Sequence, residues 1–232
     1  MTGMLASVNS LEEARLVQQA AVDIIDLKQP EQGALGALPV AVVTEIVNAL
    51  PQARISATIG DLPMRPEQIL PAVRNMAATG VDYVKIGFFP DGDWLACVDA
   101  LQAVAAQDIA LIAVLFADIH PDFGIIAELR RAGFRGVMLD TMDKRCGSLT
   151  QLLSGAELDA FVAAARAQGM LTGLAGSLRL EDVPDLLELA PDYLGFRGAL
   201  CQEHRRTAQL DLARIRRIRA SWPAEVNRAV HV

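Results

Sequence analysis

An acid and an amine, Asp26 and Lys28, stand two positions apart at the end of an apolar segment, residues 23–27. Because side chains alternate between the two faces of a β-strand, both would project to the same side, about 6–7 Å apart along the backbone. The chain has only two other lysines, Lys85 and Lys144, whereas arginine is used many times. An amine can lose its proton or form an imine with a carbonyl group, which a guanidinium cannot. Lys28 is therefore a candidate for covalent or acid–base chemistry.

The elements that carry these residues alternate between strands and helices. Short apolar runs predict eight strands, at residues 4–8, 23–27, 54–59, 82–87, 109–116, 136–139, 170–174 and 193–196. Helices are predicted between them, and capping boxes open two of these helices at Ser10 and Ser154. Eight strand–helix units in about 220 residues indicate an α/β protein with a single-domain (β/α)8 fold, the TIM barrel. We expect the barrel over residues 1–222 and a C-terminal tail over 223–232.

An open, doubly wound sheet is the alternative fold, but no Gly-x-Gly-x-x-Gly motif follows the first strand. In a (β/α)8 barrel, the active site lies at the C-terminal ends of the strands. Asp26, Lys28, Lys85 and Asp140 stand at such ends, and Lys144 follows four residues after Asp140. We therefore predict that all three lysines converge at one barrel mouth. The alternative is that each lysine only forms a salt bridge with a neighbouring aspartate at the rim.

Small residues follow the last two predicted strands. Gly176 and Ser177 come after the seventh strand, and Arg197 and Gly198 come after the eighth. Barrels of this kind commonly bind phosphate at these two positions, through free backbone N–H groups. A glycine also ends strands for steric reasons, but the two glycines together with an arginine favour a phosphate ester as substrate. Thr58, at the end of the third predicted strand, is a further candidate for substrate contact.

Composition excludes several other classes of protein. The net charge is −7 and no basic block is present, so we expect no nucleic-acid partner. No apolar run reaches the roughly 20 residues that span a bilayer, so we expect no membrane partner and a cytoplasmic location. The three cysteines lack metal-ligand spacing and the three histidines do not form a metal set. We therefore expect neither a metal nor another cofactor.

Taken together, these motifs resemble one known family. It is the (5-formylfuran-3-yl)methyl phosphate synthase family of methanofuran biosynthesis, also called 4-(hydroxymethyl)-2-furancarboxaldehyde phosphate synthase. The resemblance runs in order from about Met4 to Cys201. It is carried by Asp26-Leu-Lys28-Gln-Pro-Glu-Gln-Gly-Ala-Leu-Gly36, Ser56-Ala-Thr-Ile-Gly-Asp61, Asp82-Tyr-Val-Lys85-Ile-Gly87, Leu139-Asp-Thr141 followed by Lys144, Leu174-Ala-Gly-Ser177 and Gly195-Phe-Arg-Gly198-Ala-Leu-Cys201.

The resemblance implies a (β/α)8 barrel and a carbon–oxygen lyase that acts on phosphates. The implied reaction condenses two molecules of glyceraldehyde 3-phosphate, with loss of one phosphate and of water, into a phosphorylated furan aldehyde. The catalytic positions of the family match Asp26, Lys28, Lys85, Asp140 and Lys144. The expected partner is thus a phosphorylated triose, and further copies of the chain are expected in a homo-oligomer. The short loop 118–123 and the tail after Trp222 depart from the family pattern.

The residues account for such chemistry without the family name. An imine with a lysine makes a carbonyl compound into a carbon nucleophile, provided that the amine is partly neutral near pH 7. Burial or neighbouring cations lower a lysine pKa in this way, and Asp26 and Asp140 are then candidate proton carriers. Two alternatives remain open, namely another Schiff-base aldolase for phosphosugars and a non-catalytic phosphosugar-binding barrel. Which lysine forms the imine also remains open.

Overall fold

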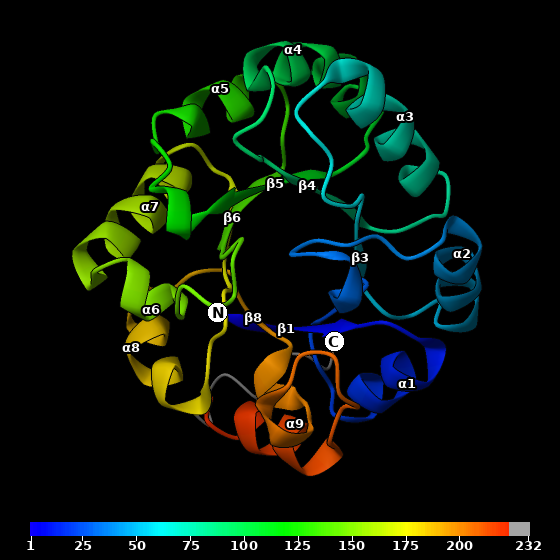
Figure 1. The fold of residues 1–232 in the computed structure, drawn as a ribbon, viewed down its shortest axis with the longest axis vertical. Helices are drawn as coiled ribbons and strands as arrows, with labels where there is room; N and C mark the ends of the chain where they lie inside the picture. Colours follow the sequence, from blue (N-terminus) through cyan, green and yellow to red (C-terminus); the bar gives the residue numbers. More distant parts are fainter. Residues whose placement is uncertain (223–232) are drawn as a thin grey trace.

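Eight parallel strands form a closed barrel in the order in which they occur along the chain (Figure 1). The computed structural model describes residues 1–222, so the predicted tail 223–232 lies outside the described residues. The strands are β1 (Gly3–Val8), β2 (Ile24–Leu27), β3 (Ile55–Thr58), β4 (Tyr83–Gly87), β5 (Leu111–Phe116), β6 (Gly136–Asp140), β7 (Leu171–Leu174) and β8 (Tyr193–Phe196). The prediction of a single (β/α)8 barrel is confirmed.

Helices surround the barrel and cover the outer face of the strands (Figure 1). They are α1 (Leu11–Gln19), α2 (Val40–Ala49), α3 (Pro66–Ala77), α4 (Trp94–Ala105), α5 (Ile125–Arg131), α6 (Leu149–Leu152), α7 (Gly155–Ala167), α8 (Val183–Glu188) and α9 (Leu212–Arg219). Single 3-10 turns occur at η1 (Pro30–Gln32), η2 (Ala117–Ile119), η3 (Leu180–Asp182), η4 (Gly198–Leu200) and η5 (Gln202–His204). Within residues 1–222, no helix is both long and apolar enough to cross a membrane.

Short sequence signals, such as capping residues and turns, determine where helices begin. The Ser154 side chain accepts a hydrogen bond from the Glu157 N–H, and Glu157 binds the Ser154 N–H in return, as the capping box predicts. The α5 helix begins at Ile125, after a turn in which the Asp122 side chain accepts a hydrogen bond from the Gly124 N–H. The long segment between β6 and α7 contains the short helix α6.

The apolar core has two parts. The larger part lies between the helices and the outer face of the strands. The smaller part fills the inside of the barrel, where Leu5, Val114, Phe116 and Met138 meet Leu35. Leu35 does not belong to a strand: it comes from the loop that follows β2 and is fully buried. Part of the barrel interior is therefore filled by a loop.

An aspartate fixes this loop. The carboxylate of Asp61, which follows β3, accepts hydrogen bonds from the N–H groups of Ala34 (2.8 Å) and Leu35 (2.7 Å). Gly33, which precedes them, has a φ of +108°, and a Cβ atom there would lie 2.0 Å from the Asp61 carboxylate. Only glycine fits this combination of dihedral angle and close contact. The glycine-rich sequence after Lys28 is thus required for packing of the loop into the barrel.

Candidate active site

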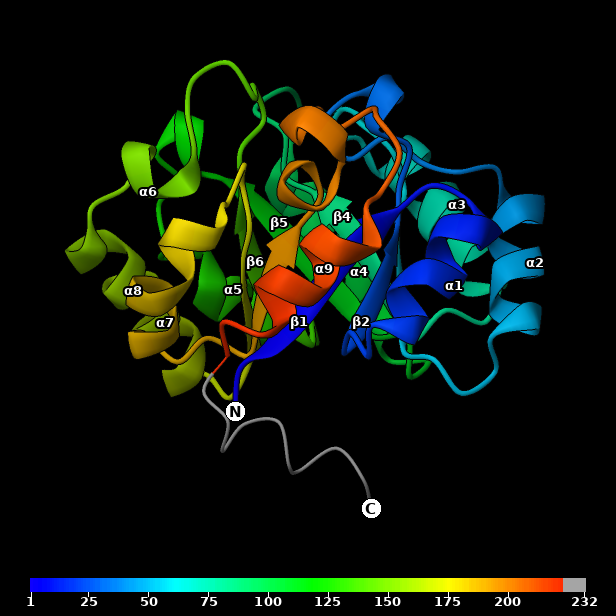
Figure 2. The ribbon, with the colours of Figure 1, turned by 90° about the horizontal axis from the view of Figure 1, so that it is seen from below.

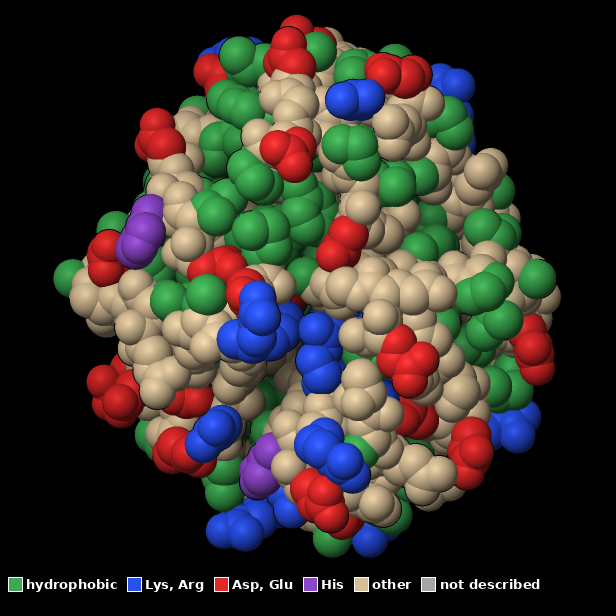
Figure 3. Space-filling model, viewed as in Figure 1, with side chains coloured by type: hydrophobic (Ala, Val, Ile, Leu, Met, Phe, Trp, Pro, Cys, Tyr) green, Lys and Arg blue, Asp and Glu red, His purple; other side chains and the backbone are tan. Residues whose placement is uncertain are grey.

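A cavity of about 490 Å³ opens at the C-terminal ends of the strands. The same end carries the long connecting segments that rise above the barrel in the side view (Figure 2). Lys and Arg side chains gather around a hollow near the centre of this face, below a larger apolar area (Figure 3). Lys28, Lys85 and Lys144 all line the cavity, together with Asp140. The structure thus brings all three lysines of the chain to one site.

Asp26 lies beneath the cavity and is completely buried. Its carboxylate accepts hydrogen bonds from the hydroxyl groups of Ser7 (2.8 Å) and Ser56 (2.6 Å) and from the Lys85 amine (3.0 Å). Burial alone would raise the pKa of Asp26, but the charges of Lys85 and Lys28 and these hydrogen bonds outweigh burial, so the pKa is lowered. Asp26 is therefore an ionised anchor for Lys85.

Asp140 and Lys144 form a second ion pair at the end of β6. The Lys144 amine donates to an Asp140 carboxylate oxygen at 2.6 Å, to the Thr141 hydroxyl at 2.9 Å and to the Thr141 carbonyl oxygen. Burial would raise the pKa of Asp140, but the charges of Lys144 and Lys28 lower it well below its usual range. The side chain of Lys144 is 19% exposed, so this amine can reach a molecule in the cavity.

Lys28 differs from the other two lysines because, within residues 1–222, its amine has no carboxylate oxygen at hydrogen-bond distance. Its amine lies 3.8 Å from the nearer Asp140 oxygen, which exceeds hydrogen-bond distance. Burial lowers the pKa of Lys28 to about 8; the negative charges of Asp140 and Asp26 oppose this shift, while Lys144 and Lys85 add to it. A substantial fraction of the Lys28 amine is therefore neutral near pH 8. A buried, partly neutral amine at the cavity wall is suited to attack a carbonyl group.

Backbone N–H groups line the cavity next to β7 and β8. Gly176, Ser177, Gly198 and Ala199 all belong to the cavity wall. Within residues 1–222, the N–H groups of Gly176 and Ser177 have no backbone acceptor, and Gly198 and Ala199 begin a 3-10 turn, where N–H groups lack a partner in the turn. Ser177 has a φ of 52°, an uncommon angle outside glycine. Together these four groups could hold an anion.

Arg197 lines the cavity, but its guanidinium is bound to other parts of the protein. All five N–H donors of its guanidinium have protein acceptors: the Glu13 carboxylate takes two, and the carbonyl oxygens of Ser7, Arg206 and Ala208 take one each. A guanidinium with every donor occupied has none left for a phosphate. The geometry thus supports a structural role for this side chain, which the sequence did not reveal because Glu13 is 184 positions away.

Thr58 is likewise engaged elsewhere. It is completely buried, and its hydroxyl donates to the carbonyl oxygen of Gly36 at 3.0 Å. It does not belong to the cavity wall. The geometry therefore argues against the predicted substrate contact and indicates that Thr58 holds the loop after β2 in place.

Sequence reasoning missed two serines that touch the site. Ser7 on β1 and Ser56 on β3 are in register with Asp26 on β2, which lies between them. A usable signal was present at Ser7, a polar residue within the otherwise apolar residues 4–8, whereas the strand of Ser56 also contains Thr58. Arg206 was also missed, although it lines the cavity. Among residues 1–222, no three His, Cys, Asp or Glu side chains form a metal-binding group.

Solved structures of other proteins share the architecture. A 3-hexulose-6-phosphate synthase superimposes with a TM-score of 0.64 over 94% of this chain and 99% of its own, at 21% identity. Phosphoribosyl anthranilate isomerase from Thermus thermophilus gives the same TM-score over 95% and 97% of the two chains, at 15% identity. Identities this low show a common fold and nothing further.

Relatives found by sequence similarity identify the family as well as the fold. A Methylorubrum extorquens protein, to which (5-formylfuran-3-yl)methyl phosphate synthase activity is provisionally ascribed, is 44% identical over 91% of this chain and 88% of its own. The (5-formylfuran-3-yl)methyl phosphate synthase of Methanopyrus kandleri is 34% identical over 86% of this chain and 89% of its own. The family model described as 4-HFC-P synthase matches residues 4–219. This chain therefore belongs to the 4-HFC-P synthase family.

Proposed function

We propose that this protein is a (5-formylfuran-3-yl)methyl phosphate synthase that condenses two molecules of glyceraldehyde 3-phosphate through an imine on Lys28. Membership of the family supports the activity. The assignment of the imine to Lys28 rests on the environment of this amine. The Lys28 side chain is buried, its nitrogen lies 3.8 Å from the nearest carboxylate oxygen, and its pKa is about 8. Atoms balance when two triose phosphates yield the furan phosphate, one phosphate and two molecules of water.

The proposed mechanism begins with attack of the neutral Lys28 amine on the aldehyde carbon of one triose phosphate. Water leaves, and the resulting iminium ion accepts the electron pair when the neighbouring carbon loses its proton. The enamine formed in this way attacks the aldehyde carbon of the second triose phosphate. Ring closure through a hydroxyl oxygen onto the iminium carbon then releases the Lys28 amine, and loss of a second water and of one phosphate completes the furan.

The remaining charged groups are assigned to proton transfer and to binding. The Asp140 carboxylate is within reach of both Lys28 and Lys144, at 3.8 and 2.6 Å, and is the proposed base. The Lys144 amine is the proposed acid for the leaving oxygen atoms. The phosphate that is retained binds the N–H groups of Gly176, Ser177 and Gly198.

Reductive trapping tests the proposal directly. Borohydride treatment in the presence of glyceraldehyde 3-phosphate should attach a triose adduct to the peptide that contains Lys28, as identified by mass spectrometry. Lys28→Arg should keep the fold, as measured by circular dichroism, and lose both the adduct and the furan product, because an arginine forms no imine under these conditions. The matched control is Lys85→Arg, which retains a cation next to Asp26 and should keep the adduct on Lys28.

Three results would contradict the proposal. An adduct on Lys85 or Lys144 would move the imine to another lysine. More than about a tenth of the activity in Lys28→Arg would exclude a covalent role, since loss of a chemical step costs well over 1.4 kcal/mol. An adduct on Lys28 without a furan product would instead indicate another Schiff-base aldolase.

A further inference from the structure

The proposed reaction places two phosphate groups in one cavity, because each triose brings its own. The proposed function assigns one phosphate to the backbone N–H groups next to β7 and β8, which leaves the second phosphate without an assigned partner. Two phosphate groups repel each other, so the second one needs a separate cation. Arginine suits this task, because its planar guanidinium binds two phosphate oxygens at once.

Four arginines line the cavity, and three of them are already engaged. Arg197 has all its donors occupied, as described above. Arg145 binds the Asp143 carboxylate through two nitrogens, at 3.0 and 2.7 Å, and its side chain is 91% exposed. Arg179 is also exposed and lies 4.0 Å from the Glu181 carboxylate. None of these three guanidinium groups is both buried and available.

The fourth arginine, Arg206, is in a different environment. It is half-buried, and its guanidinium makes one hydrogen bond within residues 1–222, from Nη2 to the carbonyl oxygen of Gly33 at 2.7 Å. Burial lowers the pKa of Arg206, and the negative charges of Asp140 and Asp61 oppose this shift. A partly desolvated guanidinium with a single neutral acceptor retains several unused donors, and an anion is the partner that would satisfy them.

The position of Arg206 fits an anion next to Lys28. Gly33, its hydrogen-bond acceptor, belongs to the loop that follows Lys28, so Arg206 reaches from the segment after η5 to the loop after β2. The Arg206 charge also acts on Asp140, the carboxylate nearest to the Lys28 amine. We propose that Arg206 binds the phosphate of the second triose phosphate. This inference rests on the proposed function, which supplies the two phosphates.

Calorimetric titration with glycerol 3-phosphate tests the site without the chemistry, because this three-carbon phosphate ester has no carbonyl group and cannot form an imine. The wild-type protein should bind two equivalents. Arg206→Gln should retain one equivalent and bind the second about 10- to 100-fold more weakly, which is the range expected for loss of a charged hydrogen bond. Glutamine is chosen because its amide group can still donate to the Gly33 carbonyl oxygen.

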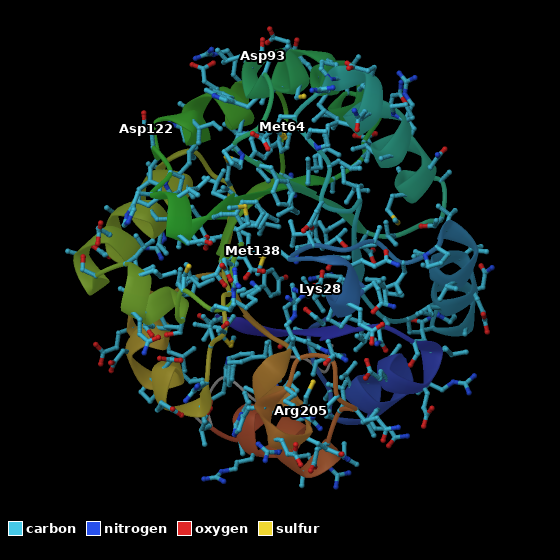
Figure 4. The ribbon with its side chains drawn as sticks, in the orientation of Figure 1. Lys28, Met64, Asp93, Asp122, Met138 and Arg205 are labelled. Carbon is cyan, nitrogen blue, oxygen red and sulfur yellow. The ribbon has the colours of Figure 1, made fainter. Side chains whose placement is uncertain are left out.

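The neighbouring residue provides the matched control. Arg205 is 70% exposed, pairs with Glu203 at 3.0 Å and does not line the cavity. It lies over the segment between β8 and α9, away from Lys28 at the centre of the barrel (Figure 4). Arg205→Gln should therefore bind both equivalents as the wild type does. Arg206→Lys, which restores the charge without the planar fork, should recover part of the lost affinity.

Two further readouts separate this inference from the proposed function. In Arg206→Gln, borohydride should still trap a triose on Lys28, while the glyceraldehyde 3-phosphate concentration for half-maximal furan formation rises about 10-fold or more. Binding of a single equivalent to the wild type, or equal affinities in Arg206→Gln and Arg205→Gln, would overturn the inference even if the furan is produced. Absence of both adduct and furan in the wild type would refute the proposed function instead.

Discussion

Three lysines of one chain meet in one cavity, yet their nitrogens have different partners. Lys85 donates to Asp26 at 3.0 Å and Lys144 donates to Asp140 at 2.6 Å, whereas Lys28 lies 3.8 Å from its nearest carboxylate oxygen. Burial lowers the pKa of Lys28 to about 8, and within residues 1–222 its amine makes no hydrogen bond to a carboxylate. The distances therefore distinguish Lys28, the proposed nucleophile, from the two lysines that are hydrogen-bonded to aspartates.

At the residue scale, we predict that Lys28 reacts first with an amine-selective reagent. With a pKa of about 8, its neutral fraction rises steeply between pH 7 and 9, and both labelling and kcat/KM should rise over the same range. Lys85 and Lys144 serve as internal controls in the same sample. Peptide mass spectrometry after brief acetylation at pH 7.5 measures the three rates, and glyceraldehyde 3-phosphate should protect Lys28. Equal rates for all three lysines, without protection, would contradict both the shared site and the imine.

At the element scale, the segment after β8 depends on an ion pair with the first helix. Arg197 and Glu13 are both largely buried, at 6% and 12% side-chain exposure, and Glu13 also accepts a hydrogen bond from the Asn9 N–H. The pair thus ties α1 to the segment that begins with Gly198, a residue of the cavity wall. The sequence suggested that Arg197 binds phosphate directly, while the contacts suggest that it positions the backbone that does so.

A double-mutant cycle distinguishes these two roles. Arg197→Ala and Glu13→Ala should each lower the free energy of unfolding by about 3 kcal/mol, because each leaves a buried charge without its partner. Both should also raise the KM for the triose phosphate, and the double mutant should be less destabilised than the sum of the two. The exposed pair Arg205 and Glu203 is the control, with an expected effect below about 1 kcal/mol.

Urea denaturation and steady-state kinetics provide the two measurements. Direct phosphate binding by Arg197 makes the opposite prediction for Glu13→Ala, since this variant would free the guanidinium for the substrate. A lower KM in Glu13→Ala, together with additive losses of stability, would therefore support direct binding.

At the scale of the whole molecule, the proposed catalytic amine reduces stability. Burial of Lys28 lowers its pKa from 10.5 to about 8, so the unfolded chain binds this proton more tightly than the folded protein does. The resulting penalty is fully present below pH 8 and decreases as the pH rises from 8 to 10.5. Lys28→Met should therefore stabilise the protein at pH 7, by about 1–3 kcal/mol, and this gain should shrink by pH 9.5.

Lys85→Met is the matched control for this prediction. Lys85 comes from the same cavity, but its removal leaves the fully buried Asp26 carboxylate without its cation. This variant should destabilise the protein at pH 7, so the two substitutions have opposite signs. Denaturant unfolding at pH 7 and 9.5 measures both. A Lys28→Met variant that is less stable than the wild type at pH 7 would show that Lys28 does not carry the predicted penalty.

Assembly is a further property at this scale. An apolar area lies on the same face as the cavity, with a rim of acidic side chains (Figure 3). A groove there is lined by Phe88, Phe89, Trp94, Ile119 and Ile125. The homo-oligomer expected from the sequence stays a prediction.

The sequence by itself determined the barrel and the place of its lysines. Continuous apolar runs, capping boxes at Ser10 and Ser154, and glycines at turns are local signals, and each acts within a few residues. Because (β/α)8 barrels gather their strand ends at one face, local assignments of Lys28 and Lys85 to strand ends were sufficient to predict a common site. The family motifs then agreed with this placement.

Only the tertiary structure decided what each of these side chains does. Four features depend on contacts between residues distant in sequence, as far as residues 1–222 show them. They are the long 3.8 Å distance from Lys28 to Asp140, the occupied donors of Arg197, the hydrogen bond from the Thr58 hydroxyl to Gly36, and the single hydrogen bond of the Arg206 guanidinium. Barrel closure and the path of the loops determine these contacts. Sequence patterns that extend over only a few residues do not predict them. Burial, which lowers the pKa of Lys28, likewise exists only once the barrel has closed.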